Sequence, residues 1–140
     1  MQTENQTITV ETTVAAPIGK VWEYWTEPTH IKKWNNASDD WHTPQAENDL
    51  RVGGKFSARM EAKDGSFGFD FGGVYDTVEE HKQIAYTLGD QRKVNITFTS
   101  EGNETKVVET FDAENTHSID MQKEGWQAIL NNFKNYTEKN

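Results

Sequence analysis

The chain has 140 residues with 14 basic and 23 acidic side chains, and the formal net charge of −9 argues against nucleic acid or an anionic membrane as a partner. It contains no cysteine, which excludes disulfide bonds and thiolate metal sites. Apolar residues make up only 34%, yet an aromatic share of 11% is typical of a folded chain rather than a disordered one, and the length predicts a single domain over residues 1–140.

The first six residues carry no basic stretch followed by an apolar run, so they do not resemble a signal peptide. No part of the chain approaches the roughly 18 consecutive apolar residues that a membrane-spanning helix needs. We therefore expect a cytoplasmic protein.

A strand and then two short helices are predicted next. Residues 7–14 alternate between apolar and polar side chains and are rich in β-branched residues, which is the pattern of a half-buried strand. Pro17 suits the first turn of a helix, because its φ is already helical and the N–H group that it lacks has no partner there. Pro28 ends that helix, and a second short helix then runs through Trp34.

From Trp41 to Phe111 the apolar residues recur with period two, which predicts a run of strands. Asp64-Gly65 is the strongest short hairpin signal in this region and joins two of them. Gly72-Gly73 interrupts the returning strand, as expected at a bulge or a sharp bend. Together with the first strand, this region predicts about six or seven strands.

The C-terminal residues change to a helical period, which predicts one helix over residues 119–137. Its apolar positions are Ile119, Trp126, Ile129, Leu130 and Phe133. Ser118 is suited to cap the N-terminus of this helix, and Asp120 lies in the first turn, where the helix dipole favours a negative charge. Strands and helices that are segregated in this way indicate an α+β fold.

Several short motifs in this order resemble the START-related helix-grip (SRPBCC) superfamily, and within it the small bacterial domains similar to the C-terminal domain of the activator of heat-shock-protein-90 ATPase. They are residues 16–17 (AP), 21–22 (VW), 52–56 (VGGKF), 59–66 (RMEAKDGS), 125–126 (GW) and 130–133 (LNNF). The resemblance implies a curved antiparallel sheet around a long C-terminal helix, with the two short helices after strand 1. It also implies an apolar cavity between that helix and the sheet, and no fixed catalytic set.

Eight apolar or aromatic residues are the candidate lining of that cavity. They are Trp41, Phe56, Met60, Phe69, Phe71, Met121, Trp126 and Leu130. The residues from the strands share faces on either side of the Asp64-Gly65 turn, and an aromatic surface of this kind is either a ligand wall or a filled core. For the helix residues, the pattern favours a packed core over a ligand wall.

Three further residues bear on the cavity. Gly125 lies inside the predicted helix, where glycine costs about 1 kcal/mol relative to alanine. It therefore either admits a close strand or leaves room for a ligand, and the first reading is favoured. His42 and Glu47 are expected near the cavity mouth, where either would contact the polar end of a ligand, although exposure on the surface is the favoured reading.

The sequence favours binding over catalysis. The four histidines are dispersed, no metal-ligand spacing or nucleophile motif is present, and no phosphate-binding loop precedes a helix, so no cofactor, metal or catalytic residue is predicted. The preferred function is non-catalytic binding of a small apolar or aromatic molecule. Two alternatives stay open: a regulator that binds a heat-shock-protein-90-type chaperone, and a cyclase or aromatase that orients a flexible substrate in the cavity.

Overall fold

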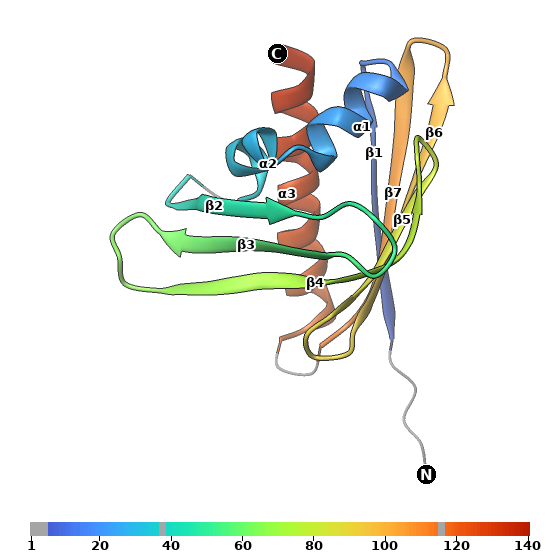
Figure 1. The fold of residues 1–140 in the computed structure, drawn as a ribbon. Helices are drawn as coiled ribbons and strands as arrows, with labels where there is room; N and C mark the ends of the chain where they lie inside the picture. Colours follow the sequence, from blue (N-terminus) through green and yellow to red (C-terminus); the bar gives the residue numbers. More distant parts are fainter. Residues whose placement is uncertain (1–5, 37–38, 115–116) are drawn as a thin grey trace.

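The computed structural model describes residues 6–36, 39–114 and 117–140 (Figure 1). These residues form seven strands and three helices. In chain order they are β1 (Thr7–Val14), α1 (Ile18–Thr26), α2 (Pro28–Trp34), β2 (Trp41–Asn48), β3 (Lys55–Ala62), β4 (Gly68–Glu79), β5 (Gln83–Leu88), β6 (Lys93–Glu101), β7 (Glu104–Asp112) and α3 (Ile119–Lys139).

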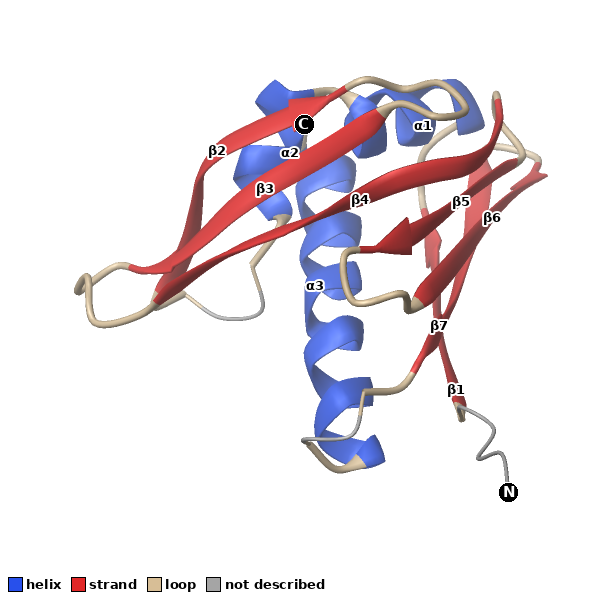
Figure 2. Cartoon of the chain, turned by 60° about the horizontal axis from the view of Figure 1, so that its bottom comes forward, coloured by secondary structure: helices blue, strands red, loops and turns tan. Residues whose placement is uncertain are grey.

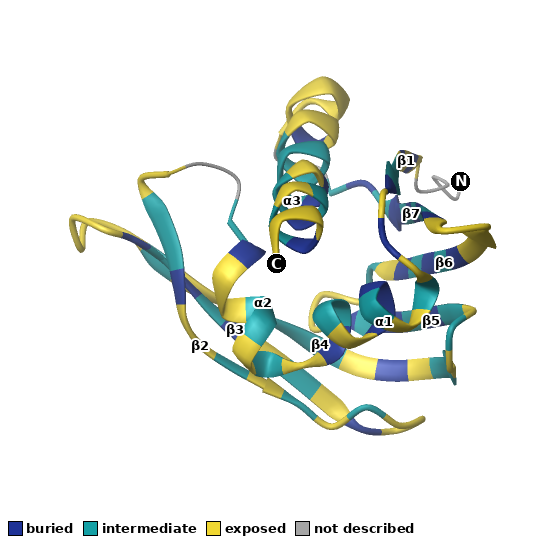
Figure 3. Ribbon diagram, turned by 90° about the horizontal axis from the view of Figure 1, so that it is seen from above, coloured by how far each residue is buried: buried dark blue, intermediate teal, exposed yellow. Residues whose placement is uncertain are grey.

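The strands form one antiparallel sheet in the order β1-β7-β6-β5-β4-β3-β2, so that β1 and β2 are its two edges. Seen from above, the sheet curls around α3, and α1 and α2 lie beside the helix within the curl (Figure 3). Figure 2 shows β2, β3 and β4 crossing α3, whereas β1 and β7 run alongside it. The predicted α+β helix-grip fold is confirmed.

Local sequence signals account for most of the element boundaries. Pro17 stands immediately before α1, and Pro28 begins α2. The Ser118 hydroxyl accepts a hydrogen bond from the Met121 N–H at 3.1 Å, which confirms the predicted cap of α3. Gly65 has a φ of +77° in the turn between β3 and β4, so the predicted Asp-Gly hairpin is also confirmed.

The predicted interruption at Gly72-Gly73 is wrong, because β4 passes through both residues without a break. A Cβ atom at Gly72 would lie 2.5 Å from the carbonyl oxygen of Phe56, and one at Gly73 would collide with the carbonyl oxygen of Thr87. The two glycines therefore allow the neighbouring strands to approach closely. The irregularity in this part of the sheet comes later, as a register shift between Tyr75 and Thr77.

The packed core lies between α3 and the part of the sheet formed by β1, β7 and β6. Leu130 and Phe133 of α3 are fully buried there, together with Val10 of β1 and Val107 of β7. Trp25 and Trp34 from the short helices pack their rings against Phe133 at centroid distances of 4.8 and 5.0 Å and close one end of the core. Within the described residues, no helix combines the length and the apolar character needed to cross a bilayer.

Candidate ligand-binding cavity

A cavity of about 410 Å³ lies between α3 and the concave face of the sheet. Its walls come from α3 on one side and from β2, β3, β4, β5 and β7 on the other, and residues of α1 and α2 line it as well. The volume falls within the roughly 300–1,000 Å³ that is usual for sites of small organic molecules. We refer to this space below as the cavity.

The structure brings six of the eight candidate lining residues together at the cavity. They are Phe56 and Met60 from β3, Phe69 and Phe71 from β4, and Met121 and Trp126 from α3. The β3 and β4 residues reach one face because the hairpin pairs Ala58 with Phe71 and Met60 with Phe69. The walls predicted on the sheet and on the helix therefore face the same space.

Trp41 and Leu130 do not line the cavity. The Trp41 ring packs against Phe67 and Phe69 at centroid distances of 6.1 and 5.9 Å, near the turn between β3 and β4. Leu130 is 0% exposed in the packed core, and Ile129 takes the place on the cavity wall. Successive side chains on a helix point about 100° apart, so Ile129 faces the cavity while Leu130 faces the packed core.

Contacts between aromatic rings hold much of the cavity wall in place. Trp126 stacks on Phe111 with a centroid distance of 3.8 Å and an interplanar angle of 12°, and its ring meets the edge of Phe71 at 6.1 Å. Phe56 packs against Tyr86 at 4.5 Å and against Tyr75 at 5.1 Å. Ring pairs at these separations are mutually attractive, which favours a preformed wall.

Gly125 leaves open space beside Trp126. A Cβ atom added there would meet nothing within 4 Å outside its own helix, and Gly125 lines the cavity. The favoured reading from the sequence, that this glycine admits a close strand, is therefore wrong. The glycine instead widens the cavity where a larger side chain would project into it.

Glu109 on β7 is a carboxyl group buried in the cavity wall, and the sequence reasoning missed it. The residue is 6% exposed, and the loss of hydration raises the pKa of its carboxyl group to about 8. The signal was present in the alternation of Thr105, Val107, Glu109 and Phe111, all four of which are buried. A strand that alternates in this way places its acidic residue on the same face as its apolar residues.

Two tyrosines add polar groups to the apolar wall. The Tyr75 hydroxyl donates a hydrogen bond of 2.5 Å to Oδ1 of Asn48, and the Asn48 amide donates to the carbonyl of Thr26 at 2.6 Å. Burial raises the pKa of both Tyr75 and Tyr86 above the ordinary value of a tyrosine. Both hydroxyl groups therefore stay protonated at neutral pH; the Tyr75 O–H is already used by Asn48, and a hydroxyl oxygen can still accept a hydrogen bond.

A second polar group of side chains lines the cavity near the start of α3. The buried Gln122 amide donates to the carbonyls of Glu114 and His117 at 3.1 and 2.9 Å, and its oxygen accepts from the Glu114 N–H at 2.8 Å. The His117 ring lies 3.0 Å from the Glu114 carboxylate. These bonds hold the segment that leads into α3 against the helix itself.

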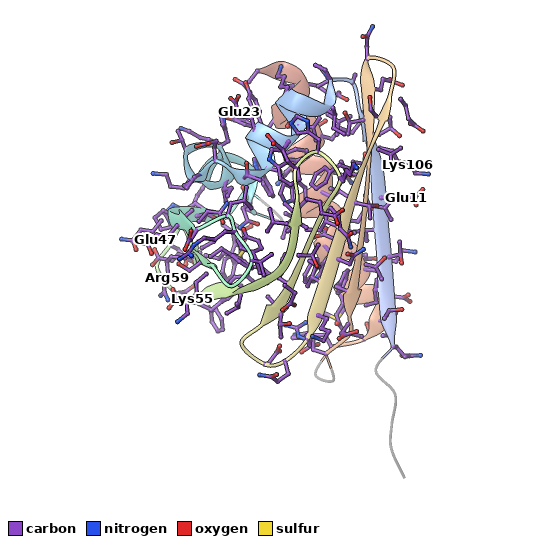
Figure 4. All side chains as sticks on the ribbon, turned by 45° about the vertical axis from the view of Figure 1, so that its right-hand side comes forward. Glu11, Glu23, Glu47, Lys55, Arg59 and Lys106 are labelled. Carbon is purple, nitrogen blue, oxygen red and sulfur yellow. The ribbon has the colours of Figure 1, made fainter. Side chains whose placement is uncertain are left out.

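Of the two residues expected at the cavity mouth, one lines the cavity and the other does not. Glu47 lines the cavity and is exposed on β2, whereas His42 lies 3.7 Å from Glu61 and does not line the cavity. Arg59 pairs with Glu61 at 2.9 Å, outside the cavity lining, and Figure 4 shows Glu47 and Arg59 near each other on the β2–β3 side of the molecule. Among the residues that the structure describes, no three acidic or histidine side chains gather where they could hold a metal ion.

Comparison with known proteins agrees with this architecture. An AHSA1-like protein from Aeromonas hydrophila, solved by NMR, is 46% identical, with 96% of this chain and 93% of that chain covered and a TM-score of 0.90. A Cytophaga hutchinsonii protein solved in solution is 59% identical, with 94% and 92% of the two chains covered and a TM-score of 0.82. A Chromobacterium violaceum crystal structure shares the fold at 21% identity and a TM-score of 0.84, covering 94% of this chain and 96% of its own.

No curated protein matched the chain. Residues 15–138 match the family described as "Activator of Hsp90 ATPase homolog 1-like protein", which spans nearly all of the helix-grip elements from α1 to α3. The chain belongs to this family of proteins like the activator of Hsp90 ATPase homolog 1.

Proposed function

We propose that the chain binds a small apolar or aromatic molecule in the cavity without chemical turnover, and that it does so in the cytoplasm. The observation that carries the proposal is the cavity of about 410 Å³, with aromatic rings on the sheet wall and on the helix wall. A helix glycine that widens the cavity adds support, because its cost in helix stability has no return in packing.

The expected affinity is modest when apolar burial acts alone. Removing about 300 Å² of apolar surface from water contributes roughly 7 kcal/mol at about 25 cal/mol per Å². Association costs at least about 4 kcal/mol in lost translational and rotational freedom. The remainder corresponds to weak binding, so polar groups in the cavity must supply the rest of the affinity and the orientation.

The test is an NMR titration of the protein with a panel of small apolar compounds, comparing two variants at Gly125. Gly125→Phe should fill the cavity and abolish the shifts of Phe56, Phe71 and Trp126 that a binding compound produces. Gly125→Ala adds one methyl group in open space and serves as the matched control that still binds. Shifts confined to the outer strands, unaffected by Gly125→Phe, would rule out the cavity as the binding site.

The chaperone alternative is favoured by a separate observation. Phe67 is 65% exposed and Phe69 is 42% exposed, and both pack against Trp41 beside the β3–β4 turn. Aromatic residues in such a position are typical of protein interfaces. ATPase stimulation of a cognate chaperone by the wild-type chain, lost in Phe67→Ser, would place this function first.

The enzyme alternative is favoured by Glu109, because a carboxyl group with a pKa of about 8 is a general acid near neutral pH. Mass spectrometry of a bound compound after long incubation separates the two functions. A ligand recovered unchanged supports binding, and a ligand converted to a cyclised product supports catalysis.

A further inference from the structure

The carboxyl group of Glu109 is the one acidic group buried deep in the cavity wall among the described residues. It lies opposite Val10 in the register with β1 and opposite Ile96 in the register with β6, so its strand neighbours are aliphatic. Among the described residues, no hydrogen bond or ion pair reaches its oxygens. A buried polar group without a partner is costly, so this carboxyl group is available to a polar group of a ligand.

The charges that line the cavity favour a positive ligand over a negative one. Three carboxyl groups line it, those of Glu47, Glu109 and Glu114. The opposing basic groups are already engaged: Arg92 Nε donates to Asp90 at 2.7 Å, and the His117 ring lies 3.0 Å from Glu114. An anionic ligand would therefore meet these carboxyl groups, while each basic group of the lining already lies beside a carboxylate.

The elements packed around Glu109 present it with no cation. Tyr86 of β5 interacts electrostatically with Glu109, and Tyr75 of β4 and Arg92 of the β5–β6 turn interact with Tyr86 in turn. The described residues of α3 that line the cavity are all uncharged: Met121, Gln122, Gly125, Trp126 and Ile129. Burial is accordingly what raises the pKa of Glu109 to about 8, with no basic neighbour to lower it.

The aromatic walls add a second source of attraction for a positive charge. Trp126, Phe56 and Tyr86 all line the same cavity as Glu109. The negative face of an aromatic ring attracts an ammonium group, and this attraction strengthens where water is excluded. A neutral ligand of the same shape gains apolar contact from these rings but not this electrostatic term.

We propose that the ligand of the cavity is an apolar organic cation, an amine carried on an aromatic or alkyl body, whose ammonium group pairs with the Glu109 carboxylate. The inference rests on the proposed function, since it names the chemistry of the molecule that the cavity binds. The apolar body fills the aromatic walls, and the single buried carboxylate sets its orientation.

The pairing makes amine binding depend on pH in a stated direction. In the free protein Glu109 is mostly protonated at neutral pH, because its pKa is about 8. The ammonium group favours the ionised carboxylate, so binding releases a proton at neutral pH, and the affinity for the amine rises as the pH increases from about 6 to about 8. A neutral ligand lacks the ammonium group, so its affinity stays nearly constant over this range.

The test is isothermal titration calorimetry with phenylbutylamine and phenylbutanol, which share their body and differ in one polar group. At about pH 8 the amine should bind at least about tenfold more tightly than the alcohol. At about pH 7, two buffers with different ionisation enthalpies should reveal proton release with the amine alone. Glu109→Gln keeps the shape and neutrality of the protonated acid, and it should remove the preference for the amine without weakening the alcohol.

Glu47→Gln is the matched control, because it removes an exposed carboxylate from the same cavity and should leave most of the preference intact. Binding of the alcohol as tightly as the amine, or a preference that survives Glu109→Gln, would overturn this inference and leave the proposed function standing. Failure of both probes to bind the wild-type chain would overturn the inference and count against the cavity function as well.

Discussion

Glu109 makes the stability of the fold depend on pH in an unusual direction. Its pKa rises from 4.5 to about 8 on folding, so between these values the folded chain holds a proton that the unfolded chain has lost. Stability from this group is therefore fully present below about pH 4.5, falls as the pH rises through the window, and levels off above about pH 8. Most carboxyl groups that shift on folding act in the opposite direction.

The first prediction is that Glu109→Gln removes this fall in stability. The difference in unfolding free energy between the variant and the wild type should shift in favour of the variant by up to about 5 kcal/mol between about pH 4 and about pH 8. Urea unfolding across this range measures it. Subtracting the wild-type curve cancels the contributions of Asp64, Asp90 and Glu138, whose pKa values are lowered. A constant difference across the range would contradict the buried carboxyl group.

The second prediction concerns Trp126, which is half-buried and stacks on Phe111. Trp126→Ala removes this stack and the contact with Phe71, and we expect a loss of about 3 kcal/mol, at the lower end for a large aromatic residue because one side faces the cavity. Trp126→Phe should lose clearly less unfolding free energy than Trp126→Ala. Chemical denaturation provides the measurement, and equal midpoints for wild type and Trp126→Ala would show that the helix face is wrongly assigned.

At the scale of the elements, Gly125 in α3 and Gly72 in β4 lack a side chain for opposite structural reasons. Gly125 sits inside α3 with open space around its missing Cβ, whereas the missing Cβ of Gly72 faces the backbone of Phe56 at 2.5 Å. The helix residue is tolerated at a cost in helix propensity, and the strand residue is required by the approach of β3. Substitution by alanine at each position therefore distinguishes the two roles.

The third prediction is that Gly125→Ala stabilises the fold by about 1 kcal/mol, because alanine is the better helix former and meets no neighbour. Gly72→Ala should instead destabilise it by about 1–3 kcal/mol, since the strands must move apart. Thermal unfolding of both variants checks the signs. A loss of stability in Gly125→Ala would mean that the space beside Trp126 is filled in solution.

Many boundaries of these elements were readable from the sequence, because they depend on local chemistry. Pro28 and Ser118 act within one helical turn, and Asp64-Gly65 acts within one hairpin. The interruption predicted at Gly72-Gly73 is wrong because these glycines answer to contacts with two other strands, which local propensity does not report. The sequence predicts the strand that carries Glu109. The prediction did not include that Glu109 shares the buried face of this strand with Val107 and Phe111.

The division between core and cavity along α3 also lay beyond the sequence. Trp126, Ile129, Leu130 and Phe133 share a helical stripe, but Leu130 and Phe133 are buried while Trp126 and Ile129 line the cavity. Helical periodicity identifies the side of a helix that faces the protein interior. It does not say whether packed atoms or an open space lie opposite, because that depends on how far the sheet curls at each level.

For the whole molecule, the fourth prediction is that a cavity ligand stabilises the fold and is sensed by both walls at once. At a hundredfold excess over its dissociation constant, the ligand should add about 2.7 kcal/mol to the unfolding free energy. NMR shifts should appear together at Phe56 and Phe71 on the sheet and at Trp126 on the helix, while residues 134–140 stay unchanged. Thermal stabilisation accompanied by shifts on one wall alone would point to binding outside the cavity.

The position of β1 in the sheet has a consequence for the timing of folding. Thr7 pairs with Asp112 and Val14 with Thr105, so the first of the described strands hydrogen-bonds to the last of them. During synthesis on a ribosome, Ile8 and Val10 stay without their sheet partner until β7 has emerged, and Leu130 and Phe133 arrive later still to cover them. Contacts this distant along the chain slow folding, because a long loop must close before they form. β1 therefore gains its sheet partner only after β7 has been made, and its cover in the core only after the second half of α3 has been made.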